Sequence, residues 1–170
     1  MDPAIQKIAE GLKKAIQAEA DGHNFYMMAS KNTSDSKGQE IFASLAKEEM
    51  DHLKFLKMQY DSFLEKGQFN EKASLPVATA LSPDKSIFSD DIKKRIKDAH
   101  YEMTALSIAI QLELSAINFY RQESNAHSDN AVKSFYKELA DWESKHYQML
   151  LNQQNLLKED YWDAGGFSPY

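Results

Sequence analysis

The strongest constraint on this chain is an internal repeat that joins two distant segments. Residues 15–57 align without a gap on residues 109–151, so each residue of the first copy matches one 94 positions later. About a third of the aligned positions are identical, including Asn24-Phe25-Tyr26 against Asn118-Phe119-Tyr120. A period near 94 residues is too long for a solenoid. We therefore interpret the chain as two copies of one helical hairpin that face each other.

Both copies carry the same acids and histidines at matching positions. They are Glu19, Glu49 and His52 in the first copy and Glu113, Glu143 and His146 in the second. Each falls on an apolar seam, at a position where leucine is expected in a packed helix. Residues three apart share one helix face, so each Glu-x-x-His pair directs a carboxylate and an imidazole toward one point. A single such pair is usually a surface ion pair, but two matched pairs on core seams indicate a metal site.

Apolar residues at steps of three and four predict two long helices in the first half. Asp2-Pro3 is typical of a helix start, and the polar cluster 32–36 of its end. Ser36 and Gln39 form a capping box that predicts the start of the second helix. We expect this helix to end at Gly67.

The second half predicts two more long helices after a long connection. Residues 67–89 contain two prolines and no sustained helical period, which favours a crossover from one end of a bundle to the other. Residues 89–91 can cap a short helical turn, and the third helix carries its seam over residues 106–120. Ser128-Asp129 caps a fourth helix that runs to Leu157. The predicted fold is all-α, a ferritin-like four-helix bundle with a long crossover between helices two and three.

Length and composition favour one domain over residues 1–170, with the bundle at about 3–157. The chain has 42% hydrophobic residues, enough for a sizeable core. The remaining tail, 158–170, contains four aromatic residues, so we expect it to dock on the bundle or on a second subunit. A role of the tail as a peptide recognised by another protein is the alternative.

Charge and residue usage exclude several classes of function. A net charge of −6 argues against nucleic acid and anionic membrane surfaces as partners. No apolar run approaches the ~20 residues that span a bilayer, and the first residues do not resemble a signal peptide, so we expect a cytoplasmic protein. The absence of cysteine excludes disulfides, thiolate zinc sites and iron–sulfur clusters.

The acids and histidines predict a centre with two metal ions. Four carboxylates in one core would each cost several kcal/mol in desolvation and would repel one another, unless cations compensate them. Two divalent ions cancel four such charges. Carboxylate and imidazole suit iron or manganese, or a mixed pair. Because six protein groups would serve two metals, some carboxylates must bridge, and coordination positions stay open for water, oxygen or peroxide.

With these motifs the chain resembles a rubrerythrin di-iron domain of the ferritin-like superfamily over residues 3–157. The resemblance implies bridging carboxylates, terminal carboxylates and one terminal nitrogen per metal. These roles fall on Glu49 and Glu143, on Glu19 and Glu113, and on His52 and His146, respectively. The fourth-helix His146 favours rubrerythrins over ferritins. The resemblance further implies an oxidoreductase that reduces hydrogen peroxide, a rubredoxin-like electron donor, and a homodimer.

Two features depart from the family pattern. Many rubrerythrins carry a further ligand Glu three residues after the third-helix Glu, where this chain has Ala116. Full-length rubrerythrins also hold a rubredoxin-like iron site of four cysteines, and this chain has none. Electrons are therefore expected to come from a separate protein.

Several residues near the predicted site have more than one reading. Tyr26 and Tyr120 lie seven residues after their helix's Glu, and each either hydrogen-bonds an opposite ligand carboxylate or packs in the core. His23 either lines the site entrance, adds a ligand, or is a packed histidine. Gly22 and Ala116 either leave space for a small oxidant or allow tight helix packing.

Two other functions remain open at this point. One is a ferritin-like storage protein whose ferroxidase activity feeds a mineral inside a shell. The other is a helical scaffold without metal. We also expect that loss of Glu49 or Glu143 stabilises the metal-free form, because repulsion among buried acids is relieved.

Overall fold

The computed structural model describes residues 3–75 and 84–166. Four long helices account for most of the described chain: α1 (Pro3–Asn32), α2 (Ser36–Lys66), α3 (His100–Ala126) and α4 (Asn130–Ala164). A 3-10 helix, η1 (Asp90–Asp98), precedes α3. The predicted all-α ferritin-like bundle of two helical hairpins is confirmed.

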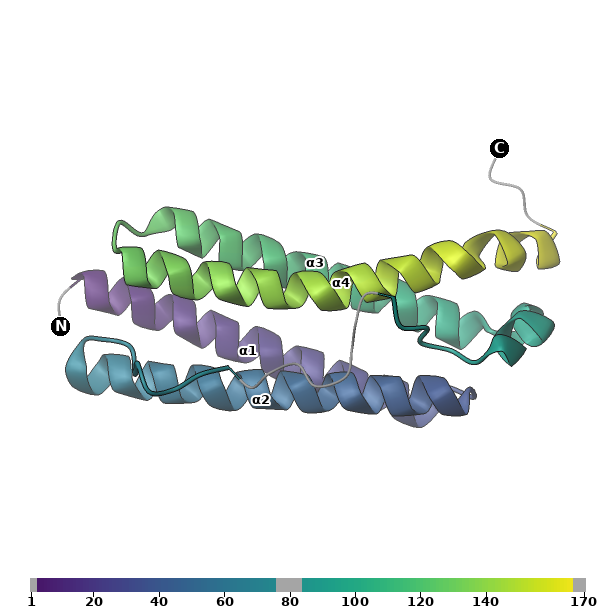
Figure 1. Cartoon of the computed structure of the whole chain (residues 1–170), viewed down its shortest axis with the longest axis horizontal. Coiled ribbons are helices and arrows are strands. Elements are labelled where there is room, and N and C mark those ends of the chain that lie inside the picture. Colours follow the sequence, from purple (N-terminus) through teal and green to yellow (C-terminus); the bar gives the residue numbers. More distant parts are fainter. Residues whose placement is uncertain (1–2, 76–83, 167–170) are drawn as a thin grey trace.

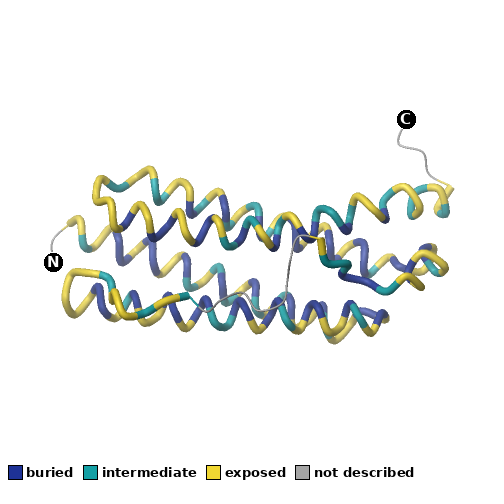
Figure 2. The backbone as a smooth tube through the Cα atoms, in the orientation of Figure 1, coloured by how far each residue is buried: buried dark blue, intermediate teal, exposed yellow. Residues whose placement is uncertain are grey.

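The helices form an elongated bundle of two hairpins (Figure 1). α1 packs along α2 and α3 along α4, while α1 also contacts α3 and α4 contacts η1. Buried residues line the inward faces of all four helices, and exposed residues line the outward faces (Figure 2). This is the distribution expected of amphipathic helices. No helix in the described ranges combines the length and apolarity needed to cross a membrane.

Asp35, rather than Ser36, caps the start of α2. The Asp35 carboxylate accepts from the backbone N–H of Gly38 at 2.9 Å, whereas Ser36 is already helical. The predicted capping box was therefore wrong by one residue. Asp35 also accepts from the backbone N–H of Ser89 at 3.0 Å and from the Ser89 hydroxyl. A carboxylate can satisfy all these donors at once, which a serine hydroxyl cannot do.

Other helix ends match the sequence. Gly67 ends α2 with a positive φ of 69°, a left-handed conformation that favours glycine, and its N–H donates to the Phe63 carbonyl. Asp129 caps α4 by accepting from the N–H groups of Ala131 and Val132. The cap predicted at Asp2 for α1 lies outside the described residues.

The described parts of the connection between the hairpins are held to the bundle by glutamine side chains. Gln59 of α2 accepts from the Asn70 N–H at 2.8 Å, and Gln153 of α4 accepts from the Ile87 N–H at 2.7 Å. Its described parts, 68–75 and 84–89, contain no helix, as predicted. Phe88 lies on Gly38 so closely that a Cβ there would stand 2.7 Å from the phenyl ring. The glycine thus makes room for the connection.

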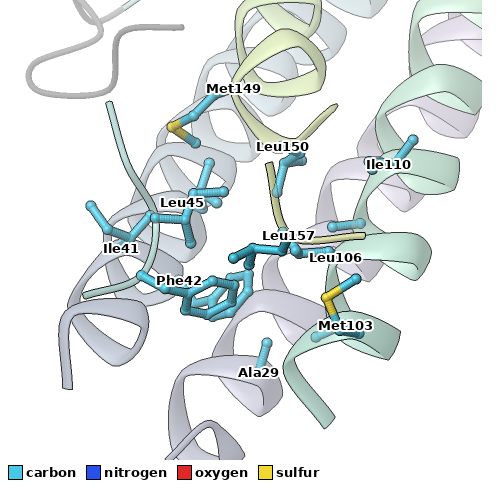
Figure 3. Packing of buried hydrophobic residues seen from close by; sticks show 14 of the residues in the cluster. Ala29, Ile41, Phe42, Leu45, Met103, Leu106, Ile110, Met149, Leu150 and Leu157 are labelled. Atoms are coloured by element: carbon cyan, nitrogen blue, oxygen red, sulfur yellow. The ribbon is translucent and has the colours of Figure 1, made fainter. Parts of the chain in front are cut away.

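The apolar core divides into two clusters, one toward each end of the bundle. Figure 3 shows the first core cluster, in which Phe42 of α2, Leu106 of α3 and Leu157 of α4 converge. The second core cluster joins the start of α1 and the end of α2 to the end of α3 and the start of α4. Tyr26 belongs to the first cluster, and its repeat counterpart Tyr120 belongs to the second. A twofold relation between the hairpins requires matching residues of the two copies to lie at opposite ends of the bundle, as these two tyrosines do.

The fourth helix is longer than the sequence pattern suggests, because it continues past Leu157 to Ala164. Tyr161 and Ala164 pack against the first core cluster. The Tyr161 hydroxyl also lies 2.6 Å from Nδ1 of His100. The first part of the predicted tail is therefore helical and docked on the bundle, and residues 167–170 lie outside the described ranges.

Candidate metal centre

The six repeated acids and histidines occupy a polar layer between the two core clusters. All four long helices contribute to this layer: α1 provides Glu19, α2 provides Glu49 and His52, α3 provides Glu113, and α4 provides Glu143 and His146. All six residues are at most 3% exposed. The seam positions of the sequence thus place every predicted ligand in the interior.

The six side chains form two groups that share two carboxylates. In each group the potential ligand atoms lie within 4.8 Å of one another. The His52 group comprises Glu19, Glu49, His52 and Glu143. The His146 group comprises Glu49, Glu113, Glu143 and His146. Glu49 and Glu143 belong to both groups, which is the geometry that bridging carboxylates need.

Both imidazoles turn Nδ1 toward the acids. His52 Nδ1 lies 3.2 Å from Glu19 Oε2 and 3.1 Å from Glu143 Oε1. His146 Nδ1 lies 3.4 Å from Glu49 Oε1 and 3.5 Å from Glu143 Oε2. One nitrogen is therefore presented to each group.

Buried atoms without hydrogen bonds indicate that this donor set fits metal ions. Among the described residues, Glu49 Oε1, Glu143 Oε1 and His146 Nδ1 are buried and have no hydrogen-bond partner. Leaving such atoms unsatisfied costs about 1–3 kcal/mol each. All three point into the shared layer, where a divalent cation would satisfy them together. Oxygen and imidazole donors match iron and manganese.

In the absence of metal, the four carboxylates fall into two pairs whose pKa values shift in opposite directions. Burial and the charge of Glu143 raise the pKa of Glu113 to about 8. Burial and the charges of Glu143 and Glu49 likewise raise the pKa of Glu19 well above its usual range. Glu113 is therefore mostly protonated at pH 7, and burial favours the neutral form of Glu19 in the same way.

The two shared acids remain ionised. Burial and Glu49 would raise the pKa of Glu143, but its contacts with His52 and His146 outweigh them and lower it to about 2. Burial likewise opposes ionisation of Glu49, yet its proximity to Glu19 and to both histidines lowers its pKa well below its usual range. Burial would also lower the pKa of each histidine, but the surrounding carboxylates raise both. In the metal-free layer the shared acids thus favour the charged form of both histidines, and the histidines favour the charged form of the shared acids.

Two buried tyrosines hold the terminal acids from across the bundle. The Tyr26 hydroxyl of α1 donates to Glu113 of α3, and the Tyr120 hydroxyl of α3 donates to Glu19 of α1. Burial, followed by the charge of the acid that each one contacts, raises the pKa of both phenols well above 10. Both tyrosines therefore stay protonated and donate to these acids. Of the two readings of the sequence, the structure places them in contact with the predicted ligands.

A cavity of about 290 Å³ leads to the acids between α1 and α3. Its inner end is formed by all four predicted carboxylates, and Lys14 and Asp21 also line it. Small and apolar side chains line the rest, including Gly22, Leu112 and Ala116. A Cβ at Gly22 would stand 3.6 Å from the Glu49 side chain, an ordinary contact distance. Gly22 and Ala116 thus border open space next to the acids.

His23 lies outside this arrangement. Its Nδ1 is 2.7 Å from the backbone carbonyl of Ala46 on α2, and the side chain is half-buried. This contact supports the reading of His23 as a packed histidine. It is not a member of either ligand group.

The sequence reasoning missed Glu48, which is buried beside the layer. Its Oε2 lies 2.9 Å from Nε2 of His146. The corresponding position in the second copy is Trp142, whose ring packs edge-on against His52 with centroids 4.8 Å apart. The repeat alignment itself contained a signal, because positions 48 and 142 directly precede the shared acids and differ in character.

Comparison with known proteins gave one family match. The family model described as Rubrerythrin matches residues 10–152, which include all six predicted ligands. No curated protein and no solved structure shows a significant match to the chain.

Proposed function

Because the chain belongs to the rubrerythrin family, we propose that its buried acids and histidines hold two metal ions, with iron as the resident pair, and that the protein reduces hydrogen peroxide. The two ligand groups that share Glu49 and Glu143 are the observation that carries this proposal. Glu19 and His52 complete one metal position, and Glu113 and His146 complete the other.

The residues of the chain prepare the site for such chemistry. When bound, an iron pair supplies the two electrons that convert one peroxide and two protons into two waters. Tyr26 and Tyr120 fix the orientation of the terminal acids through their hydrogen bonds. The apolar walls of the cavity limit the water that reaches the acids, which strengthens electrostatic interactions there.

The cavity between α1 and α3 offers peroxide a route to the metal positions. It reaches all four carboxylates, and its volume of about 290 Å³ exceeds that of a molecule with two oxygen atoms. The chain contains no cysteine and so cannot hold a rubredoxin-type iron site. The proposal assigns the return of the electrons after each turnover to a separate redox protein.

Metal analysis and rapid mixing test the proposal in sequence. Protein produced with added iron should contain nearly two metal ions per chain, and Glu49→Ala should remove most of them. The diferrous protein is then mixed separately with peroxide and with oxygen while its absorbance is followed. Peroxide should oxidise the centre much faster than oxygen does. Fast oxidation by oxygen with slow oxidation by peroxide would refute the assigned reaction, and absence of metal would refute the site.

A further inference from the structure

The two predicted metal positions differ in what holds the outer nitrogen of the histidine. Nε2 of His146 lies 2.9 Å from the Glu48 carboxylate. Nε2 of His52 is buried, and within the described ranges it has no hydrogen-bond partner. The ring of Trp142 packs edge-on against His52 instead.

This difference interrupts an otherwise matched pair of ligand groups. Both groups use the same two shared acids, and each adds one terminal acid and one histidine. Each terminal acid accepts a hydrogen bond from a tyrosine of the opposite hairpin. Glu48 and Trp142 occupy the same position of the repeat, directly before a shared acid. One hairpin thus supplies an anionic acceptor where the other supplies an indole.

The Glu48 contact determines which nitrogen of His146 can bind a metal. An ionised carboxylate can only accept, so Nε2 of His146 carries the hydrogen whenever this bond forms. Once a metal ion displaces any proton on Nδ1, the lone pair of that nitrogen is directed toward the shared acids. A carboxylate on the outer nitrogen of a metal-binding histidine fixes the ring and increases electron donation, and its loss typically weakens metal binding about 10–100-fold. His52 lacks this support in the described structure.

We infer that the two metal positions are inequivalent, and that the His146 group binds its ion first and more tightly than the His52 group. Glu48 acts as a positioning residue for His146, and Trp142 leaves the second position weaker. This inference rests on the proposed dimetal site. It concerns the order of loading and is independent of the oxidant that the centre reduces.

The first test is a titration of the metal-free wild-type protein with cobalt(II), in which calorimetry and visible absorption monitor binding. Two binding steps should appear, separated about 10–100-fold in affinity. Crystals grown with one equivalent of Co²⁺ should show the anomalous peak beside His146. A peak beside His52, or equal peaks at both positions, would overturn the inference. If wild-type protein binds no Co²⁺, the proposed function fails as well, so the two failures are distinguishable.

Variants at the two matched positions provide the second test. Glu48→Leu should weaken the first step about 10–100-fold and bring the two steps together. Exposed Glu40 lies on the same helix, so Glu40→Leu serves as the control and should leave both steps unchanged. An unchanged first step in folded Glu48→Leu protein would contradict the assigned role.

The reciprocal change offers His52 the missing acceptor. Trp142→Glu should strengthen the second step, whereas Trp142→Leu removes the same indole without adding a carboxylate. Equal second steps in these two variants would count against the carboxylate explanation. Thermal melts followed by circular dichroism establish that each variant is folded before its binding is compared.

Discussion

Replacing Glu113 by glutamine should stabilise the metal-free protein at neutral pH. The pKa of Glu113 rises from 4.5 to about 8 in the folded chain, mainly because the side chain is buried. Between these values the folded chain holds a proton that the unfolded chain releases, so stability falls as pH increases. Each pH unit above 4.5 costs about 1.4 kcal/mol, which gives about 3 kcal/mol at pH 7.

Glutamine suits this experiment because it resembles the protonated acid. The amide is neutral, and its oxygen can still accept from the Tyr26 hydroxyl. The charges of the shared acids and histidines are therefore retained. The free energy of unfolding of metal-free Glu113→Gln should exceed that of wild type by about 3 kcal/mol at pH 7, and this difference should vanish near pH 4.5.

Urea unfolding in the presence of EDTA at pH 5, 6 and 7 measures this difference. Glu102→Gln provides a control with the opposite sign on the same helix. Glu102 is buried too, but it accepts from Thr33 Oγ1 and from the backbone N–H and hydroxyl of Ser34, which lower its pKa despite burial. The free energy of unfolding of Glu102→Gln should be about 1–3 kcal/mol lower than that of wild type at pH 7. A constant difference between Glu113→Gln and wild type across this pH range would refute the reasoning.

Three further outcomes follow from the same layer. Glu143→Leu should lower the stability of metal-free protein by about 3 kcal/mol at pH 7, because it removes one of the two anions that His52 and His146 share, and urea unfolding with EDTA measures the loss. An unchanged or higher stability would restore the expectation from sequence. Co²⁺ binding should release protons from groups such as Glu113 and His146, so affinity should fall from pH 8 to pH 6. Calorimetry in buffers of different ionisation enthalpy counts these protons, and no buffer dependence would contradict the protonation pattern. Ala116→Leu should slow oxidation of the diferrous centre by peroxide while Co²⁺ affinity changes less than twofold, and equal losses in both would argue against the cavity as the entry route.

The pKa values in the folded chain favour the opposite outcome to the expectation that loss of a bridging acid stabilises the metal-free form. Sequence reasoning treated the four carboxylates as alike, because it could count charges but could not place protons. In the folded chain Glu143 is ionised between two histidines, whereas Glu113 is protonated. The unfavourable acids are therefore the terminal ones. Protonation depends on distances between helices, and those distances are absent from the spacing of residues along one helix.

The burial of the candidate ligands could be predicted because it depends on local periodicity. Glu49 and His52 share one face of α2 whatever the rest of the chain does. Glu48 escaped notice because its neighbour His146 lies on α4, and adjacent helix residues point in directions about 100° apart. For the same reason, the sequence could not show whether Asp35 or Ser36 caps the start of α2. Its extra donor, Ser89, lies 54 residues away in the connection.

The contact between Phe88 and Gly38 limits how similar the two repeated hairpins can remain within one chain. A single covalent link has no symmetric copy, so it covers one hairpin at a point where the other hairpin meets different neighbours. The glycine beneath Phe88 corresponds in the repeat to Val132, which packs in the second core cluster. A residue that suits one copy would therefore collide or leave a void in the other. Fusion of two identical hairpins imposes divergence at such positions, even while the centre between them keeps its paired ligands.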